Sequence, residues 1–196
     1  MYRIIRLPVF ALILLFHVQL FASSPVSYRI KSHEMQIEGT SNLQSWSAEV
    51  ERLNGSFSVT LDNGRITELH DVNLRIDATS IKGSEGRRMD SKIYESLNTS
   101  SHPQITFVLR DVTSLAENPG TYRIGTRGVL TVAGVSRVVN LNTVGRVLPN
   151  GDLEFSGTHQ IKMSDFRISP PTALLGTLRT GDEVTLNYKV VLQANR

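Results

Sequence analysis

The residues that could do chemistry are few and scattered along the chain. Cysteine is absent, which removes disulfides, thiolate metal sites and cysteine nucleophiles. Four histidines lie beyond the N-terminal segment, and none of them is in His-x-His or His-Glu-x-x-His spacing: His33, His70, His102 and His159. A zinc site is therefore not expected. Gly-x-Ser-x-Gly and Gly-x-x-x-x-Gly-Lys motifs are also absent, which weakens an enzymatic interpretation without excluding it. We expect no metal and no cofactor.

Two polar features still call for an interpretation. His159 shares the inward face of an alternating segment with Phe155. The simpler interpretation is a buried, neutral histidine that is hydrogen-bonded to the backbone. In the other, His159 is the polar contact for a ligand head group inside an apolar cavity. An enzymatic function would require a polar cluster at the mouth of the fold, for which His102, Asp165 and Arg167 are the candidates.

The elements that must position these side chains are strands. Apolar and polar residues alternate along residues 57–61, 72–76, 105–109 and 184–192, which indicates antiparallel sheet with one wet face. Asn63-Gly64 and Asn150-Gly151 are strong hairpin signals between such segments. Strands joined by short turns predict one all-β domain, either a sandwich or a barrel.

One segment departs from this pattern and predicts an amphipathic α-helix. Within residues 85–97, Met89, Ile93 and Leu97 recur every four residues among charged side chains, and Ser84 could cap the start. This helix either packs across an edge or mouth of the sheet, or belongs to the core without a functional role.

Small residues on the inward faces favour a cavity. Thr126 and Gly128 follow one another on one predicted strand, and Gly157 lies between Phe155 and His159 on another. Small inward residues could leave the interior unfilled, and a barrel of about eight strands can hold one small ligand. The alternative at each glycine is a bulge or close packing of the sheet.

The N-terminus has the layout of a secretory signal peptide. Arg3 and Arg6 precede an apolar run over residues 7–21, and small residues follow from Ala22. The run is short for a membrane span, and cleavage after Ala22 leaves residues 23–196 as one domain. Because the two arginines account for most of the excess of 21 basic over 18 acidic residues, the mature chain is close to neutral and no nucleic-acid partner is expected.

Four passages resemble the YceI-like family of lipid- or polyisoprenoid-binding proteins. They are residues 39–43 with Trp46, residues 88–107 with His-Pro-Gln-Ile-Thr-Phe at 102–107, residues 128–135, and residues 163–166 with 181–184. Family members often carry Arg-x-Asp-Phe-Gly where this chain has Met163 and Arg167 at the outer positions. The resemblance implies an exported, lipocalin-like antiparallel β-barrel with one helix, an elongated apolar interior and no catalytic residues.

The resemblance and the alternation together predict a periplasmic or secreted protein. It would hold a long isoprenoid or similar chain for transport, storage or stress response, with no stable membrane span after cleavage. Exposed strand edges would also allow a homodimer. The alternative is a structural or interaction barrel whose interior is filled. The residues expected to line or close the ligand cavity are Trp46, Phe57, Leu74, Ile76, Phe107, Leu109, Leu130, Phe155, His159, Phe166, Leu186 and Tyr188.

Overall fold

The computed structural model describes residues 24–173 and 176–195, so the predicted signal peptide lies outside the described residues. Helix α1 spans Arg87–Ser96, and short 3₁₀ helices span Ala78–Ser80 and Met163–Phe166. The strands are β1 (Val26–Ser41), β2 (Ser45–Val50), β3 (Leu53–Asp62), β4 (Arg65–Asp77), β5 (Ile81–Gly83), β6 (Gln104–Asn118), β7 (Thr121–Val132), β8 (Val135–Val147), β9 (Leu153–Lys162), β10 (Thr172–Ala173) and β11 (Leu178–Ala194).

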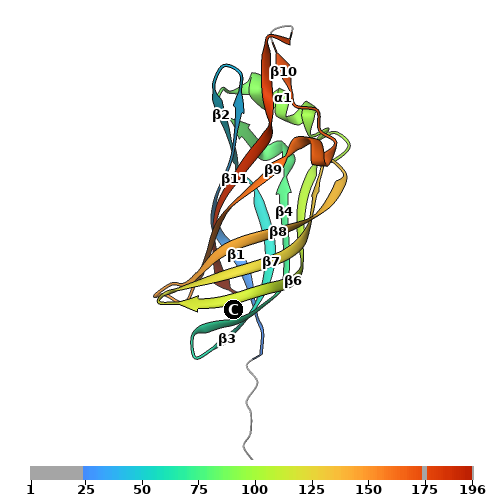
Figure 1. Ribbon diagram of the computed structural model, residues 1–196. Coiled ribbons are helices and arrows are strands. Elements are labelled where there is room, and N and C mark those ends of the chain that lie inside the picture. The colour runs from blue at the N-terminus through green and yellow to red at the C-terminus, as the bar shows by residue number, and fades with distance from the viewer. Residues whose placement is uncertain (1–23, 174–175, 196) are drawn as a thin grey trace, which may run out of the picture.

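Eight of these strands form a closed antiparallel barrel (Figure 1). The neighbours run in the order β1, β3, β4, β6, β7, β8, β9 and β11, and β11 then pairs with β1. The closing ladder runs from Tyr28 opposite Ala194 to Ser41 opposite Thr180. Strands β2, β5 and β10 extend the sheet beyond the ring. The predicted all-β, lipocalin-like barrel with one helix is confirmed.

Hairpin turns form at Asn63-Gly64 and Asn150-Gly151, as the sequence indicated, and a further tight turn joins β7 to β8. Asn63 and Gly64 join β3 to β4 with φ angles of 48° and 78°, which match the two left-handed positions of a type I′ turn. Ala133 and Gly134 join β7 to β8 with φ angles of 47° and 77°. These turns fix the register of the strands that they connect.

At the lower end of the barrel in Figure 1, β3 turns into β4. Buried side chains of the core pack inside this end. Val59, Leu153 and Leu192 are each 0% exposed there. Just above them, the rings of Phe57 and Phe155 stack with their centroids 6.3 Å apart. This well-packed region stabilises the ring of strands and forms a floor beneath the rest of the interior.

Helix α1 lies at the upper end (Figure 1). Met89, Ile93 and Leu97 are half-buried and pack against the core, as their spacing predicted. The helix begins at Arg87, and the expected cap at Ser84 is wrong. Gly86 precedes the helix without a side-chain cap, and the Asp90 carboxylate instead accepts a hydrogen bond from the Gly83 N–H at 2.8 Å.

Three aromatic rings lie over glycines of neighbouring strands. Trp46 lies over Gly39, Phe107 over Gly128, and Tyr188 over Gly157, so a Cβ atom at any of these glycines would collide with the ring. Aromatic cover of a strand glycine restores the packing that the glycine itself lacks. The expectation that Gly128 and Gly157 leave empty space is therefore wrong, and close packing is the correct alternative at both positions.

Replacing Gly128 with alanine tests this packing. Overpacking costs about 1–3 kcal/mol, and removing a strand glycine returns roughly 0.5–1 kcal/mol. We therefore expect Gly128→Ala to lower the free energy of unfolding by about 1–2 kcal/mol in urea titrations. In a Phe107→Leu background the ring is gone, so the same replacement should cost clearly less. An equal cost in both backgrounds would contradict the ring contact as its cause.

Candidate functional site

The candidate site is an apolar cavity of about 120 Å³ inside the barrel. All eight strands of the ring contribute lining side chains, which are mostly leucine, isoleucine, valine and phenylalanine. The strands position them by simple alternation, because every second side chain of a closed barrel points inward. The stacked rings of Phe57 and Phe155 lie at its lower end.

Ten of the twelve residues predicted from the sequence line this one cavity. They come from β3, β4, β6, β7, β9 and β11: Phe57, Leu74, Ile76, Phe107, Leu109, Leu130, Phe155, His159, Leu186 and Tyr188. The structure thus brings together side chains that are far apart in the sequence. Phe57 and Tyr188, which both line the cavity, are 131 positions apart.

Trp46 and Phe166 lie outside the cavity lining. Trp46 is on β2, which is not part of the ring, and its Nε1 donates a hydrogen bond to the Thr40 carbonyl oxygen at 3.2 Å. Phe166 is 2% exposed within a second cluster with Val132 and Ile168. It belongs to a 3₁₀ helix that follows β9, where the two-residue period of a strand no longer decides which way a side chain points.

Sequence reasoning missed the contributions of β1 and β8 to the site. Met35 lines the cavity from β1, and Val139, Leu141 and Thr143 line it from β8. The signal was available, because these three residues alternate with the exposed Asn140 and Asn142.

The cavity wall also carries a few polar groups. The hydroxyls of Tyr188 and Thr143 are hydrogen-bonded across the wall at 2.7 Å. Burial raises the pKa of Tyr188, so its phenol stays protonated and uncharged at neutral pH. This pair satisfies its own hydrogen-bonding needs and adds no charge to the interior.

His159 is another polar group of the wall, in addition to Thr106 and Thr126. It faces the cavity, and within the described part of the chain its ring makes no hydrogen bond, so the expected bond to the backbone is not observed. Burial lowers the pKa of His159 below the ordinary value of 6.5. The imidazole is therefore neutral at pH 7 and offers one donor and one acceptor to whatever occupies the cavity.

The polar cluster that an enzymatic function would require has three candidates among the described residues, His102, Asp165 and Arg167. No group of histidine and carboxylate side chains among residues 24–173 and 176–195 is arranged to hold a metal ion. No hydrogen bond or ion pair joins His102, Asp165 and Arg167 within the same part of the chain. The arrangement can bind an apolar molecule by burial, since each buried methylene contributes about 0.8 kcal/mol.

None of the helices in the described part of the chain is both long enough and apolar enough to cross a membrane.

The lowered pKa of His159 makes stability depend on pH. The unfolded chain binds a proton at His159 more readily than the folded barrel does. The stability that the neutral, buried His159 contributes is therefore complete above pH 6.5 and is lost as the pH falls through the folded pKa. We expect the free energy of unfolding of the wild type to fall more steeply from pH 7.5 to pH 5 than that of His159→Gln. Urea titrations across this range measure both, and parallel curves would contradict burial of a neutral imidazole.

Solved structures with similar folds come from several bacteria. BcnA of Burkholderia cenocepacia is 19% identical, with a TM-score of 0.59 over 81% of this chain and 95% of that one. A polyisoprenoid-binding domain from Saccharophagus degradans is 12% identical, with a TM-score of 0.67 over 87% and 99%. A Campylobacter jejuni YceI protein is 18% identical, with a TM-score of 0.58 over 76% and 84%. At these identities the likeness establishes the fold.

No curated protein sequence matches the chain. The family model described as the YceI-like domain matches residues 23–192, which is nearly the whole described barrel. The order of the motifs, the closed eight-strand ring and the apolar cavity agree with this match, and the chain belongs to the YceI-like domain family.

Proposed function

We propose that the protein binds one long apolar chain, an isoprenoid or a similar lipid, in the barrel cavity. The observation that carries this proposal is the cavity itself, which is lined from all eight strands by mostly apolar side chains. A barrel that served only as a structural or interaction domain would fill this interior, as it does around Val59 and Leu192.

The shape of the lining supports a long, thin ligand. On β4 the lining residues extend from Leu69 to Ile76, which at about 3.3 Å per residue is roughly 23 Å of wall. The cavity volume of about 120 Å³ is small for that length, so the space suits a single chain better than a fused-ring molecule. Affinity then grows with the number of buried methylenes rather than with specific polar contacts.

The family and its relatives support the same class of ligand. The Saccharophagus degradans structure is described as a polyisoprenoid-binding domain, and the similarity to this chain extends over 99% of that domain. The basic and then apolar N-terminal segment supports export to the periplasm or the cell exterior. In this proposal the protein carries or stores its ligand, or sequesters it under stress, without catalysis.

Two substitutions on β8 test the proposal with a matched control. Leu141→Phe adds bulk inside the cavity, whereas Val138→Phe adds the same ring on the outer face, where Val138 is 57% exposed. Native mass spectrometry of protein purified from its own host should detect a retained apolar ligand in the wild type and in Val138→Phe. We expect Leu141→Phe to retain little or none, and to bind a polyene fatty alcohol at least about tenfold more weakly.

A barrel without a binding function would give a different result. All three proteins would be free of ligand, and the fluorescence of the polyene alcohol would not change when it is mixed with any of them. Equal retention by Leu141→Phe and Val138→Phe would place the ligand outside the cavity and would also contradict the proposal.

A further inference from the structure

The described residues cover both ends of the cavity, which raises the question of how a ligand enters. At the lower end lie the stacked rings of Phe57 and Phe155, with the filled core beneath them. At the upper end, Leu97 of the α1 segment and the buried Phe166 pack with Ile105 and Leu130. A ligand that entered through either end would have to displace a packed apolar cluster.

The side wall has a weak joint between β4 and β6. These strands, of 13 and 15 residues, share five residue pairs, from Asp77 opposite Gln104 to Asn73 opposite Val108. The ladders of β8 with β9 and of β1 with β3 are equally short or shorter, with five and four pairs. Both β4 and β6 continue well beyond their shared pairs, β4 back to Arg65 and β6 on to Asn118. An ion pair at 3.6 Å between Arg65 and Glu117 connects them again at the far end. Between these two connections the backbones are not paired with each other.

Bulges explain why the ladder stops where it does. On β4, the pairing with β3 shifts between Asn73 and His70, and Asp71 in this shift has a φ angle of 45°. On β6, the pairing with β7 shifts at Arg110. A bulge bends its strand and increases the local twist. Because each strand is bent just past the last shared pair, the two strands diverge.

The divergence leaves a groove of about 400 Å³, which we call the lateral groove. Residues 67–71 of β4 line one side, and residues 109–112 with Leu115 line the other. Leu69 and Leu109 line both this groove and the apolar cavity. These half-buried side chains therefore lie between the outside of the barrel and its interior at this point.

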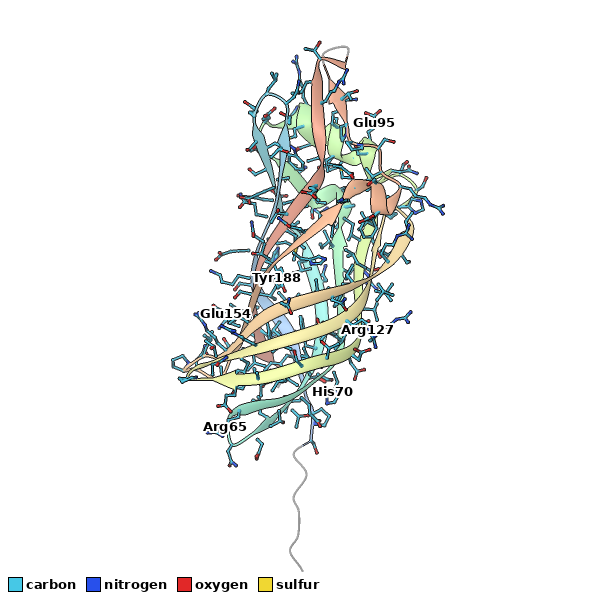
Figure 2. All side chains as sticks on the ribbon, in the orientation of Figure 1. Arg65, His70, Glu95, Arg127, Glu154 and Tyr188 are labelled. Atoms are coloured by element: carbon cyan, nitrogen blue, oxygen red, sulfur yellow. The ribbon has the colours of Figure 1, made fainter. Side chains whose placement is uncertain are left out.

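The rim of the lateral groove is polar, and acidic groups outnumber basic ones. Glu68 and Asp71 lie on the β4 side, and Glu68 Oε2 is 3.0 Å from His70 Nε2. On the β6 side, Asp111 is paired at 2.7 Å with Arg127 of β7, which lies outside the lining. Arg110 carries the positive charge within the lining. Figure 2 shows His70 and Arg127 in the lower half of the barrel. Such a rim accepts hydrogen-bonding groups but disfavours an added negative charge.

We propose that the lateral groove is the entrance to the cavity, and that it holds the uncharged, hydrogen-bonding end of a single-chain lipid, such as a hydroxyl, while the chain passes between Leu69 and Leu109 into the barrel. This inference rests on the proposed function. It adds a route and an end-group preference, which the apolar cavity alone does not supply.

Blocking the groove tests the route. Because the chain has no cysteine, His70→Cys can be labelled selectively with a bulky maleimide, and Arg110→Cys provides a second block from the opposite strand. Gln160→Cys, exposed on β9 on the opposite side of the ring, is the matched control. Stopped-flow fluorescence with parinaryl alcohol, a linear polyene alcohol, gives association and dissociation rates for each labelled protein.

We expect the label at either groove position to slow both rates about tenfold, with the dissociation constant changed less than about threefold, because a blocked route affects passage rather than the bound state. Leu69→Ala should speed dissociation. Rates at both labelled groove positions equal to those of labelled Gln160→Cys would overturn the route while leaving the proposed function intact. Failure of the unlabelled protein to bind the probe would instead contradict the proposed function, and this inference with it.

The end-group preference has its own test. Parinaryl alcohol and parinaric acid share one chain and differ only in the end group, which is charged in the acid at pH 7.5. The apolar cavity by itself favours the alcohol, so the informative measurement is a change in the ratio of the two dissociation constants. We expect Glu68→Gln combined with Asp71→Asn to reduce the preference for the alcohol at least about threefold. An unchanged ratio would overturn the role of the rim.

Discussion

The closing ladder between β1 and β11 is the interaction on which the rest of the structure depends. It joins the two ends of the described chain over residues 28–41 and 180–194 and turns an open sheet into a ring. Closure gives each barrel strand a neighbour on both sides. The backbone hydrogen bonds of the ring then hold the barrel together without a completely filled centre. A cavity is tolerable here because the structure does not rely on core packing along its whole length.

Side-chain packing decides where along the barrel the empty space remains. The lower third is filled by fully buried aliphatic residues such as Val59 and Leu153. Above it, the glycines do not create space, because Phe107 and Tyr188 lie over Gly128 and Gly157. The space that remains is bounded by inward side chains of ordinary size on widely separated strands. The glycines are thus not the source of the cavity, which a ring of eight strands is wide enough to hold.

Much of this could be predicted from the sequence, because alternation is a local signal. Alternation within single strands was enough to predict that Leu74, Ile76 and Tyr188 point inward. The signal for the Asn63-Gly64 turn lies in two adjacent residues and is equally local. Alternation did not separate lining residues from those behind the lining: Phe166, which follows the end of a strand, packs against the lining residues Ile105 and Leu130 from outside. Trp46 is on β2, which lies outside the ring. The glycine contacts, and the bulges at Asp71 and Arg110, depend on which strands become neighbours, and no pattern within one strand reveals that.

The weak joint between β4 and β6 follows from the way the chain connects them. Of the seven other neighbouring pairs of the ring, four are joined by short turns, and β1 with β11 closes the ring through a long ladder. The remaining two, β1 with β3 and β9 with β11, are connected through β2 and through β10. Between β4 and β6 the chain instead makes a long excursion through β5 and α1 at the upper end, and the ladder begins at that end and stops after five pairs. No turn holds the lower parts together, so two bulges suffice to separate them.

Unpaired strand edges invite association with other chains, and the charged side chains of Glu68, Asp71 and Arg110 at this opening oppose that. The same charges make the groove polar, whereas the interior beside it is apolar. An amphipathic ligand that enters here would find a polar environment for its end group and an apolar one for its chain.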